Sequence, residues 1–137
     1  MRLSLPVALM VALAACGADT STGPTPATFA GTWFITSVSG DGLPYVLQAA
    51  NPKLEILNDA LAVNASGTFV RNHLYRTTQG TTVTIQSVAD TGTFVITGAA
   101  VTFRQNTDGS TLTGSLSGNS LAVMESGLVY KYTKPEY

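Results

Sequence analysis

The side chains best suited to bind a ligand or to catalyse a reaction lie on one short segment of this sequence. The pattern over residues 68–78 alternates, which places Arg71, His73 and Tyr75 on one face of an extended strand. Neighbours on one face of a strand lie about 7 Å apart, so the three would form a ladder of hydrogen-bond donors. A ladder facing an interior would suit the carboxylate or phosphate head group of an amphiphile. A ladder facing outward would be a row of solvated strand residues, the usual place of charged side chains.

A catalytic role for this segment has little support in the sequence. His73 is the only histidine of the chain, and its strand neighbours include no carboxylate that could orient it as a general base. Asp side chains in turns hydrogen-bond the backbone, and turns are the expected places of four aspartates: Asp41, Asp59, Asp90 and Asp108. Glu55 and Glu125 could meet only through a contact that the sequence does not specify. We therefore expect a protein that is not an enzyme.

The composition narrows the class of protein further. Of 137 residues, 7 are Lys or Arg and 8 are Asp or Glu, so a net charge of -1 gives no field that would attract nucleic acid. One Cys and one His exclude a disulfide within the chain and a Cys/His metal cluster, and we expect no metal or cofactor. Charged residues are 11% of the chain, below the usual share of about 25%. Thr, Ser and Gly are abundant, which indicates a β-rich protein.

The N-terminus has the features of a secretory leader. An apolar run over residues 3–15 is shorter than the roughly 20 residues of a membrane-spanning helix. The run ends in four residues that resemble the lipobox of bacterial lipoproteins: Leu13-Ala14-Ala15-Cys16. The resemblance implies that residues 1–15 are a signal peptide, that Cys16 carries fatty acyl chains such as palmitate, and that the protein is anchored in the cell envelope. Gly17, where an Asp would favour the inner membrane, points to the outer membrane.

A spacer separates this leader from the folded domain. Residues 16–28 contain almost no apolar side chain, and Pro24 and Pro26 lack the backbone donor that a helix or sheet needs. We expect them to form a disordered tether behind the acylated cysteine. The domain is then one unit over residues 29–137, of a size at which a single hydrophobic core is stable without cross-links.

The domain alternates apolar and polar residues over short runs bounded by turn residues, which predicts antiparallel strands. Ten strands are expected, at residues 32–38, 54–57, 60–64, 68–78, 81–88, 93–97, 100–105, 111–117, 120–125 and 128–133. The connections are too short for a crossover helix. The predicted fold is therefore all-β, an antiparallel up-and-down meander closed into a barrel of about eight to ten strands, with a β-sandwich as the alternative. Residues 42–52 could form a strand, a helical turn or a lid.

The first predicted strand opens with a family motif. Gly31-Thr32-Trp33 resembles the G-x-W motif at which lipocalins and lipocalin-like bacterial domains begin their barrel. The resemblance implies that Trp33 packs across the closed end of the barrel, under a cation from the last strand. Arg is usual at that place, whereas this chain offers Lys131. The contact would be a cation–π interaction.

Two functions of different classes follow from these features. The first is a membrane-anchored lipoprotein whose lipocalin-like barrel binds a small hydrophobic or amphipathic ligand through Arg71, His73 and Tyr75. The second is an interaction or structural module of the envelope, of inhibitor or adhesion type, whose packed, ligand-free barrel acts through its loops. An exposed apolar patch around residues 43–47 would favour the second function. In both cases we expect a monomer that meets the membrane through Cys16.

Overall fold

The computed structural model describes residues 23–136. The expected signal peptide, Cys16 and the first part of the expected tether therefore lie outside the described residues. Within residues 23–136, no helix has the length and apolar character needed to cross a membrane.

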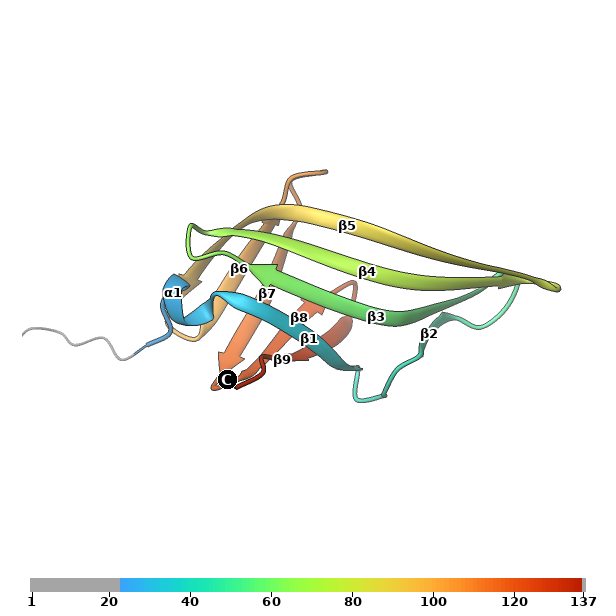
Figure 1. Ribbon diagram of the computed structural model, residues 1–137, viewed down its shortest axis with the longest axis horizontal. Helices are drawn as coiled ribbons and strands as arrows, with labels where there is room; N and C mark the ends of the chain where they lie inside the picture. Colours follow the sequence, from blue (N-terminus) through green and yellow to red (C-terminus); the bar gives the residue numbers. More distant parts are fainter. Residues whose placement is uncertain (1–22, 137) are drawn as a thin grey trace, which may run out of the picture.

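Nine strands and one short helix make up this part of the chain (Figure 1). Their bounds are α1 Pro26–Phe29, β1 Gly31–Val38, β2 Tyr45–Gln48, β3 Lys53–Val63, β4 Thr68–Gln79, β5 Thr82–Thr97, β6 Ala100–Gln105, β7 Thr111–Ser117, β8 Ser120–Glu125 and β9 Leu128–Thr133. All pairings are antiparallel. Eight strands form a closed barrel because β1 pairs with β9 on one side and with β3 on the other, and β2 is an added strand beside β3. The predicted all-β up-and-down barrel is confirmed.

β3 and β5 are each continuous where the sequence pattern predicts two strands. The predicted strands 54–57 and 60–64 merge into β3, and the predicted strands 81–88 and 93–97 merge into β5. A register shift in the pairing of β3 with β4 interrupts the regular ladder without ending the strand. The barrel itself therefore has eight strands, the lower end of the expected range.

The prediction that Asp59 and Asp90 lie in turns is wrong. Asp59 lies in β3 opposite His73 of β4, and Asp90 lies in β5 opposite Arg71 of β4. Asp is disfavoured in strands because its side chain competes for nearby backbone hydrogen bonds. Here Arg71 and His73 of β4 lie against these two carboxylates, so the two strands continue through them.

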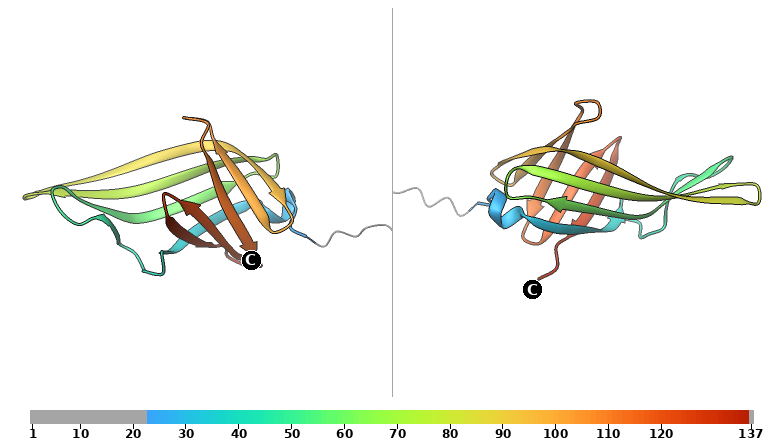
Figure 2. Two further views of the ribbon diagram at one scale, coloured as in Figure 1. Left: turned by 180° about the vertical axis from the view of Figure 1, so that it is seen from behind. Right: turned by 45° about the horizontal axis from the view of Figure 1, so that its top comes forward.

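Three strands extend well beyond the barrel. β3, β4 and β5 have 11, 12 and 16 residues, whereas β6 to β9 have 6 or 7. The sheet formed by β2 and residues 53–57, 74–79 and 82–88, which we call the extension, projects from the end of the molecule opposite α1 (Figures 1 and 2). β2 pairs with β3 at the edge of this sheet. Residues 42–52, left open by the sequence pattern, thus supply an edge strand.

The other end of the barrel is closed by α1 and Trp33. Phe29 and Trp33 are both fully buried, and the Trp33 indole N–H donates to the Phe29 carbonyl at 3.0 Å. The Thr25 side chain caps α1 by accepting from the Thr28 N–H. The last residues of the expected tether, 25–28, are therefore part of the folded domain.

The cation over Trp33 is Lys134, and the expectation that Lys131 takes this place is wrong. Lys134 Nζ lies 5.5 Å from the indole ring centre and also donates to two backbone carbonyls at the start of the domain. Lys131 is exposed because it alternates with the buried Tyr130 and Tyr132, which turns its side chain to the outside of the barrel. The closed end thus keeps the expected cation–π contact, with a lysine three residues further along.

Aromatic side chains fill the barrel above this closed end. The rings of Phe69 and Phe103 meet edge to face with centres 5.3 Å apart, and those of Phe29 and Phe94 with centres 5.1 Å apart. Such contacts add about 0.5–1.5 kcal/mol each beyond the burial of apolar area. This half of the interior is therefore a solid core.

Gly92 permits the close packing of β5 against β6, so its replacement by Ala should destabilise the protein. An added Cβ would lie 1.9 Å from the Arg104 carbonyl oxygen and 2.7 Å from the Phe69 ring. We expect Gly92→Ala to lower the free energy of unfolding by about 1–3 kcal/mol or more, measured by urea denaturation. Gly42→Ala is the control, since nothing lies within 4 Å of its added Cβ. Equal stability of the two variants would contradict the packing described here.

Candidate functional site

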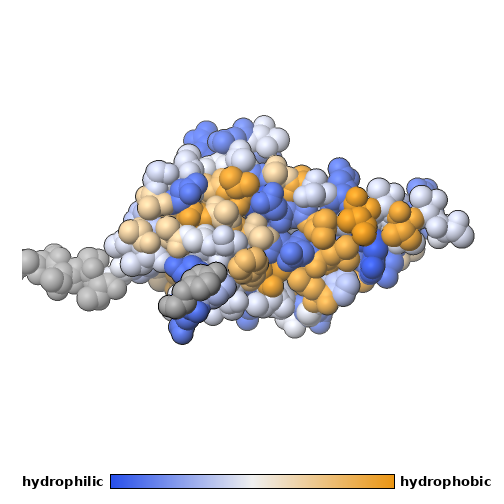
Figure 3. Space-filling model, in the orientation of Figure 1, coloured by the Kyte–Doolittle hydropathy of each residue, from blue (hydrophilic) through white to orange (hydrophobic). Residues whose placement is uncertain are grey.

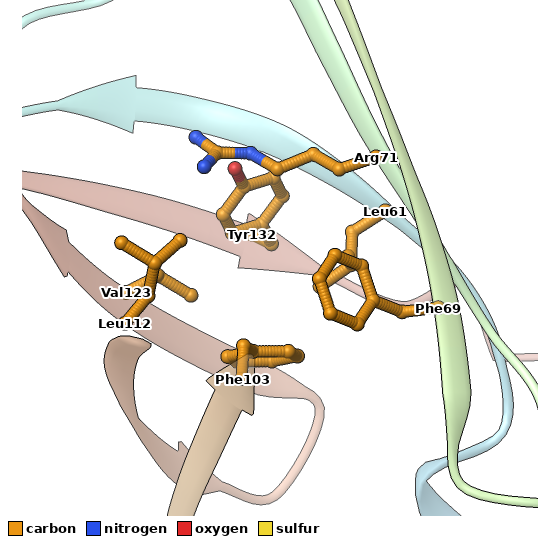
Figure 4. Close-up of a pocket in the computed structure, with 7 residues that line it drawn as sticks. All are labelled: Leu61, Phe69, Arg71, Phe103, Leu112, Val123 and Tyr132. Carbon is orange, nitrogen blue, oxygen red and sulfur yellow. The ribbon is translucent and has the colours of Figure 1, made fainter. Parts of the chain in front are cut away.

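The face of β4 that carries Arg71, His73 and Tyr75 lines the barrel interior. Arg71 and His73 are buried, and Tyr75 is half-buried. Figure 4 shows the Arg71 guanidinium beside the Tyr132 hydroxyl, with Phe69 and other apolar side chains further down the interior. Of the two orientations that the sequence leaves open, the inward one is found.

Asp59 of β3 is the centre of a buried polar cluster. Its Oδ2 atom accepts hydrogen bonds from Arg71 Nε at 3.0 Å and from the Tyr132 hydroxyl at 2.9 Å. The same oxygen lies 3.1 Å from His73 Nδ1 and 2.9 Å from Arg71 Nη2. Side chains from β3, β4 and β9 therefore meet at one carboxylate oxygen, which links opposite parts of the barrel wall through the interior.

Two further carboxylates lie between this cluster and the solvent. Arg71 Nη1 donates to Glu125 Oε2 at 2.5 Å, and His73 Nε2 lies 3.0 Å from Asp90 Oδ2. The Glu125 and Asp90 side chains are 26% and 25% exposed. With both ring nitrogens facing carboxylates, a protonated His73 can donate to both, whereas the neutral ring can donate to one. We call this group the charged core: Asp59, Arg71, His73, Asp90, Glu125 and Tyr132.

Aromatic rings pack against Arg71 and His73 of the charged core. The Arg71 guanidinium lies 4.8 Å from the centre of the Tyr130 ring. The His73 and Tyr75 rings stack with centres 5.6 Å apart and an interplanar angle of 16°. A cation over an aromatic face is stabilised by about 0.5–2 kcal/mol, more when it is desolvated. Tyr75, expected to contact a ligand, thus contacts His73.

Burial and charge oppose each other at Asp59. Burial alone would raise the pKa of the Asp59 carboxyl, but the hydrogen bond from His73 and the charge of Arg71 outweigh burial, so the pKa is lowered. Burial raises the pKa of Tyr130 to about 12 and also raises the pKa of Tyr132. At neutral pH the cluster therefore combines an ionised Asp59 with neutral tyrosine hydroxyls.

The charged core leaves little space and few free donors for a ligand. The space beside Arg71 that Figure 4 shows measures about 10 Å³, near the smallest volume that holds one water molecule. Arg71 Nε and Nη1 donate to Asp59 and Glu125, whereas Arg71 Nη2 lies 2.9 Å from Asp59 Oδ2 but makes no hydrogen bond of good geometry. The guanidinium thus faces two carboxylates of the protein itself. Among the described residues, no three His, Cys, Asp or Glu side chains are placed to hold a metal ion.

The sequence pattern predicts Arg71 and His73 of the charged core together on one strand face, but it predicts none of their carboxylate partners. A signal for Asp59 was present: if residues 53–63 are one strand, alternation from Leu61 and Val63 places Asp59 on the same inward face. Glu125 carried no such signal, because it reaches Arg71 from 54 residues away in the sequence. That contact depends on barrel closure.

A second group of ion pairs lies on the outer face of the extension. Glu55 Oε2 accepts from Arg76 Nε at 2.7 Å, and Glu55 Oε1 lies 2.9 Å from Lys53 Nζ. The hydrogen bonds from Arg76 and Lys53 lower the pKa of Glu55 to about 2. Glu55 lies opposite Val46 of β2 and Arg76 of β4, and its ion pair with Arg76 joins β3 to β4 in the extension.

The fold and interior together define a class of protein, a closed eight-stranded up-and-down barrel with a charged core. Comparison of the chain with protein-family models, with curated proteins and with solved structures finds no match. A function for this barrel therefore has to come from its own residues and geometry.

Loss of the Asp59 carboxylate should destabilise the barrel strongly. Asp59→Ala leaves buried Arg71 and His73 without their shared acceptor, and breaking a buried ion pair on one side costs about 3–5 kcal/mol. We expect a loss of that size in the free energy of unfolding, measured by urea denaturation. The exposed Asp41 is the control, and Asp41→Ala should change stability by less than about 0.5 kcal/mol. A similar small loss at both positions would argue against the charged core.

Acid should remove the stabilising effect of Glu55. The folded-state pKa of about 2 lies below the ordinary value of 4.5, so the ionised carboxylate stabilises the fold above pH 4.5 and this stability is lost as the pH falls toward 2. Wild type should therefore be more stable than Glu55→Gln at about pH 6, and the difference should vanish near pH 2. Denaturant unfolding across this range measures it. A difference that does not change with pH would refute the assigned ion pairs.

Proposed function

We propose that the protein is an interaction module of a bacterial cell envelope: a packed barrel, anchored through an acylated Cys16, that presents the extension to a partner protein. The observation that carries this proposal is the filled interior. Aromatic rings occupy the closed half of the barrel, and the charged core with a remaining space of about 10 Å³ occupies the level above it. The surfaces left for recognition are on the outside.

A small hydrophobic or amphipathic ligand, the other function considered, has less support from this geometry. Its head group would have to displace the Glu125 carboxylate from Arg71 and then share the interior with Asp59 and Asp90. Removing a partner from a buried ion pair is costly. An anionic head group would also meet two further negative charges, which disfavours it.

The outer face of the extension has the composition of a protein-binding surface. Val46, Val83 and Ile85 are large apolar side chains with 41%, 58% and 61% of their area exposed. They flank the ion pair of Glu55 with Arg76, so apolar area and a polar centre lie on one sheet face. Figure 3 shows apolar side chains gathered over this end of the molecule. Exposed apolar side chains around a polar centre are typical of interaction sites.

The proposed anchor supports the same assignment. The chain enters the barrel at α1, and the tip of the β4–β5 hairpin lies at the opposite end of the molecule (Figure 1). Cys16 precedes Pro26 by ten residues, which span at most about 35 Å when extended. An acylated Cys16 would therefore hold the closed end near the bilayer and let the extension point away from it, with the lipobox resemblance favouring the outer membrane.

Membrane attachment should depend on Cys16. In cells expressing the full chain, we expect the wild-type protein in the membrane fraction and extractable only with detergent, because two or three acyl chains hold a protein almost permanently. Cys16→Ser should shift the protein to the soluble fraction or leave it unprocessed, and mass spectrometry should find acyl chains on the wild type alone. Equal fractionation of the two proteins, without acylation, would contradict the anchor.

Photo-crosslinking tests the interaction surface. A photoreactive amino acid at Val46, on the outer face of the extension, should give an adduct of one discrete mass in intact cells, because a bound partner excludes water from that face. The control position is Val95, which is 65% exposed on the outside of the barrel itself and should give none. Failure at Val46, or equal adducts at both positions, would contradict an interaction function for the extension.

A further inference from the structure

β5 has a long free edge. On one side it pairs with β4 along the whole of β4, from Thr68 opposite Thr93 to Gln79 opposite Thr82. On the other side it pairs with β6 only over residues 92–97. Within the described part of the chain, no strand pairs with the β6-side edge of residues 82–90. This edge therefore offers a row of backbone donors and acceptors to solvent.

The side chains at this edge can be assigned from the hairpin geometry. Gln79 and Thr82 flank a two-residue loop, so they form the hydrogen-bonded closing pair of the β4–β5 hairpin, and every second residue after Thr82 bonds to β4. The residues between them direct their N–H and C=O groups to the free edge: Val83, Ile85, Ser87 and Ala89. Thr91, next in this series, confirms the direction, because its carbonyl accepts from the Asn106 N–H at 2.8 Å.

The free edge lacks the devices that normally prevent pairing with another chain. Edge strands are usually protected by charged side chains, by proline or by bulges. From residue 77 to residue 89 the chain contains no charged residue and no proline, and the β4–β5 pairing is regular throughout. The segment is rich in Thr, Val and Ile, which favour strands. The segment includes Val83 and Ile85, whose side chains are both more than half exposed.

We propose that two copies of this protein pair antiparallel along the free edges of β5, joining their extensions into one continuous sheet. The proposal goes beyond the interaction function above: it adds a second copy at the β5 edge and leaves Val46, on β2 at the other edge of the sheet, open to the partner protein. It replaces the expected monomer. A second copy fits because antiparallel pairing of identical strands brings any edge charge close to its own like charge, and this edge carries none. The net charge of -1 adds little repulsion between copies.

The apolar residues select one register for this pairing. With Val83 opposite Ile85 of the second copy, both copies contribute Val83 and Ile85 to one four-residue apolar cluster on the outer face. The backbone groups of these two residues face the edge, so they form the hydrogen-bonded pairs of the new ladder. Thr84 then lies opposite Thr84 of the second copy in a non-hydrogen-bonded pair, the closer type, with Cβ atoms about 4.5–5.5 Å apart.

Disulfide cross-linking tests this register. Thr84→Cys, made in the full chain and oxidised in isolated cell envelopes, should give a disulfide-linked species of twice the chain mass on a non-reducing gel. Gln86→Cys is the matched control on the same strand face, since its copies would be offset by four residues, or about 13 Å. The wild-type chain, with Cys16 alone, is the blank. The Thr84→Cys band should be absent from both.

A second pair of variants tests whether the edge itself makes the contact. In the Thr84→Cys background, Val83→Lys places like charges in the paired sheets and should abolish the cross-linked band. Val95→Lys puts the same charge on an equally exposed valine of β5 where the strand is paired with β6, and should leave the band unchanged. Circular dichroism of the purified proteins should show the same strand content in both lysine variants.

Several outcomes would overturn the proposal. These are no cross-link at Thr84→Cys, equal cross-links at Thr84→Cys and Gln86→Cys, a band that survives Val83→Lys, or an adduct with a different protein. A missing Thr84→Cys cross-link together with a discrete Val46 photo-adduct would refute pairing between copies while leaving the interaction function in place. Absence of both would refute the two proposals together.

Discussion

The structure depends on the way in which a single carboxylate oxygen is satisfied inside the barrel. Asp59 Oδ2 is fully buried, accepts hydrogen bonds from Arg71 and Tyr132, and lies 3.1 Å from His73 Nδ1. An ionised carboxylate without such partners would be far too costly to bury, and the cations would be equally costly without the carboxylate. The charged core therefore specifies which strands face each other across the interior. It also fills the part of the barrel interior that lies beyond the aromatic rings of the closed end.

This constraint is the basis for the proposed choice between the two functions that the sequence allows. A ligand-binding barrel needs an interior with space and with polar groups aimed at that space. Here Arg71 and His73 face carboxylates of the protein itself, and the closed end is packed with aromatic rings. The long strands β3, β4 and β5 place their unpaired surfaces outside the barrel, in the extension. In the proposed function, the barrel is a rigid support for that sheet.

The sequence was informative where local chemistry controls structure and uninformative where tertiary contacts do. Turn residues and period-two alternation located the barrel strands, and the G-x-W motif placed Trp33 at the closed end. The sequence predicts turns at Asp59 and Asp90 because Asp in turns bonds the backbone, and only Arg71 and His73 on the neighbouring strand make them strand residues. It predicts Lys131 as the cation over Trp33, whereas Lys134 takes this place, since that choice depends on where the chain leaves the last strand.

The central claim, that the barrel works with a filled interior, is tested most directly by native mass spectrometry of the full-length protein extracted from cell envelopes in detergent. The account predicts a mass equal to the processed chain with its acyl groups, or to whole multiples of it, and no other molecule retained when the detergent is removed in the gas phase. A small molecule retained in a one-to-one ratio, and lost when Tyr75 at the rim is replaced by Ala, would contradict it. That result would show that the interior opens to admit a ligand.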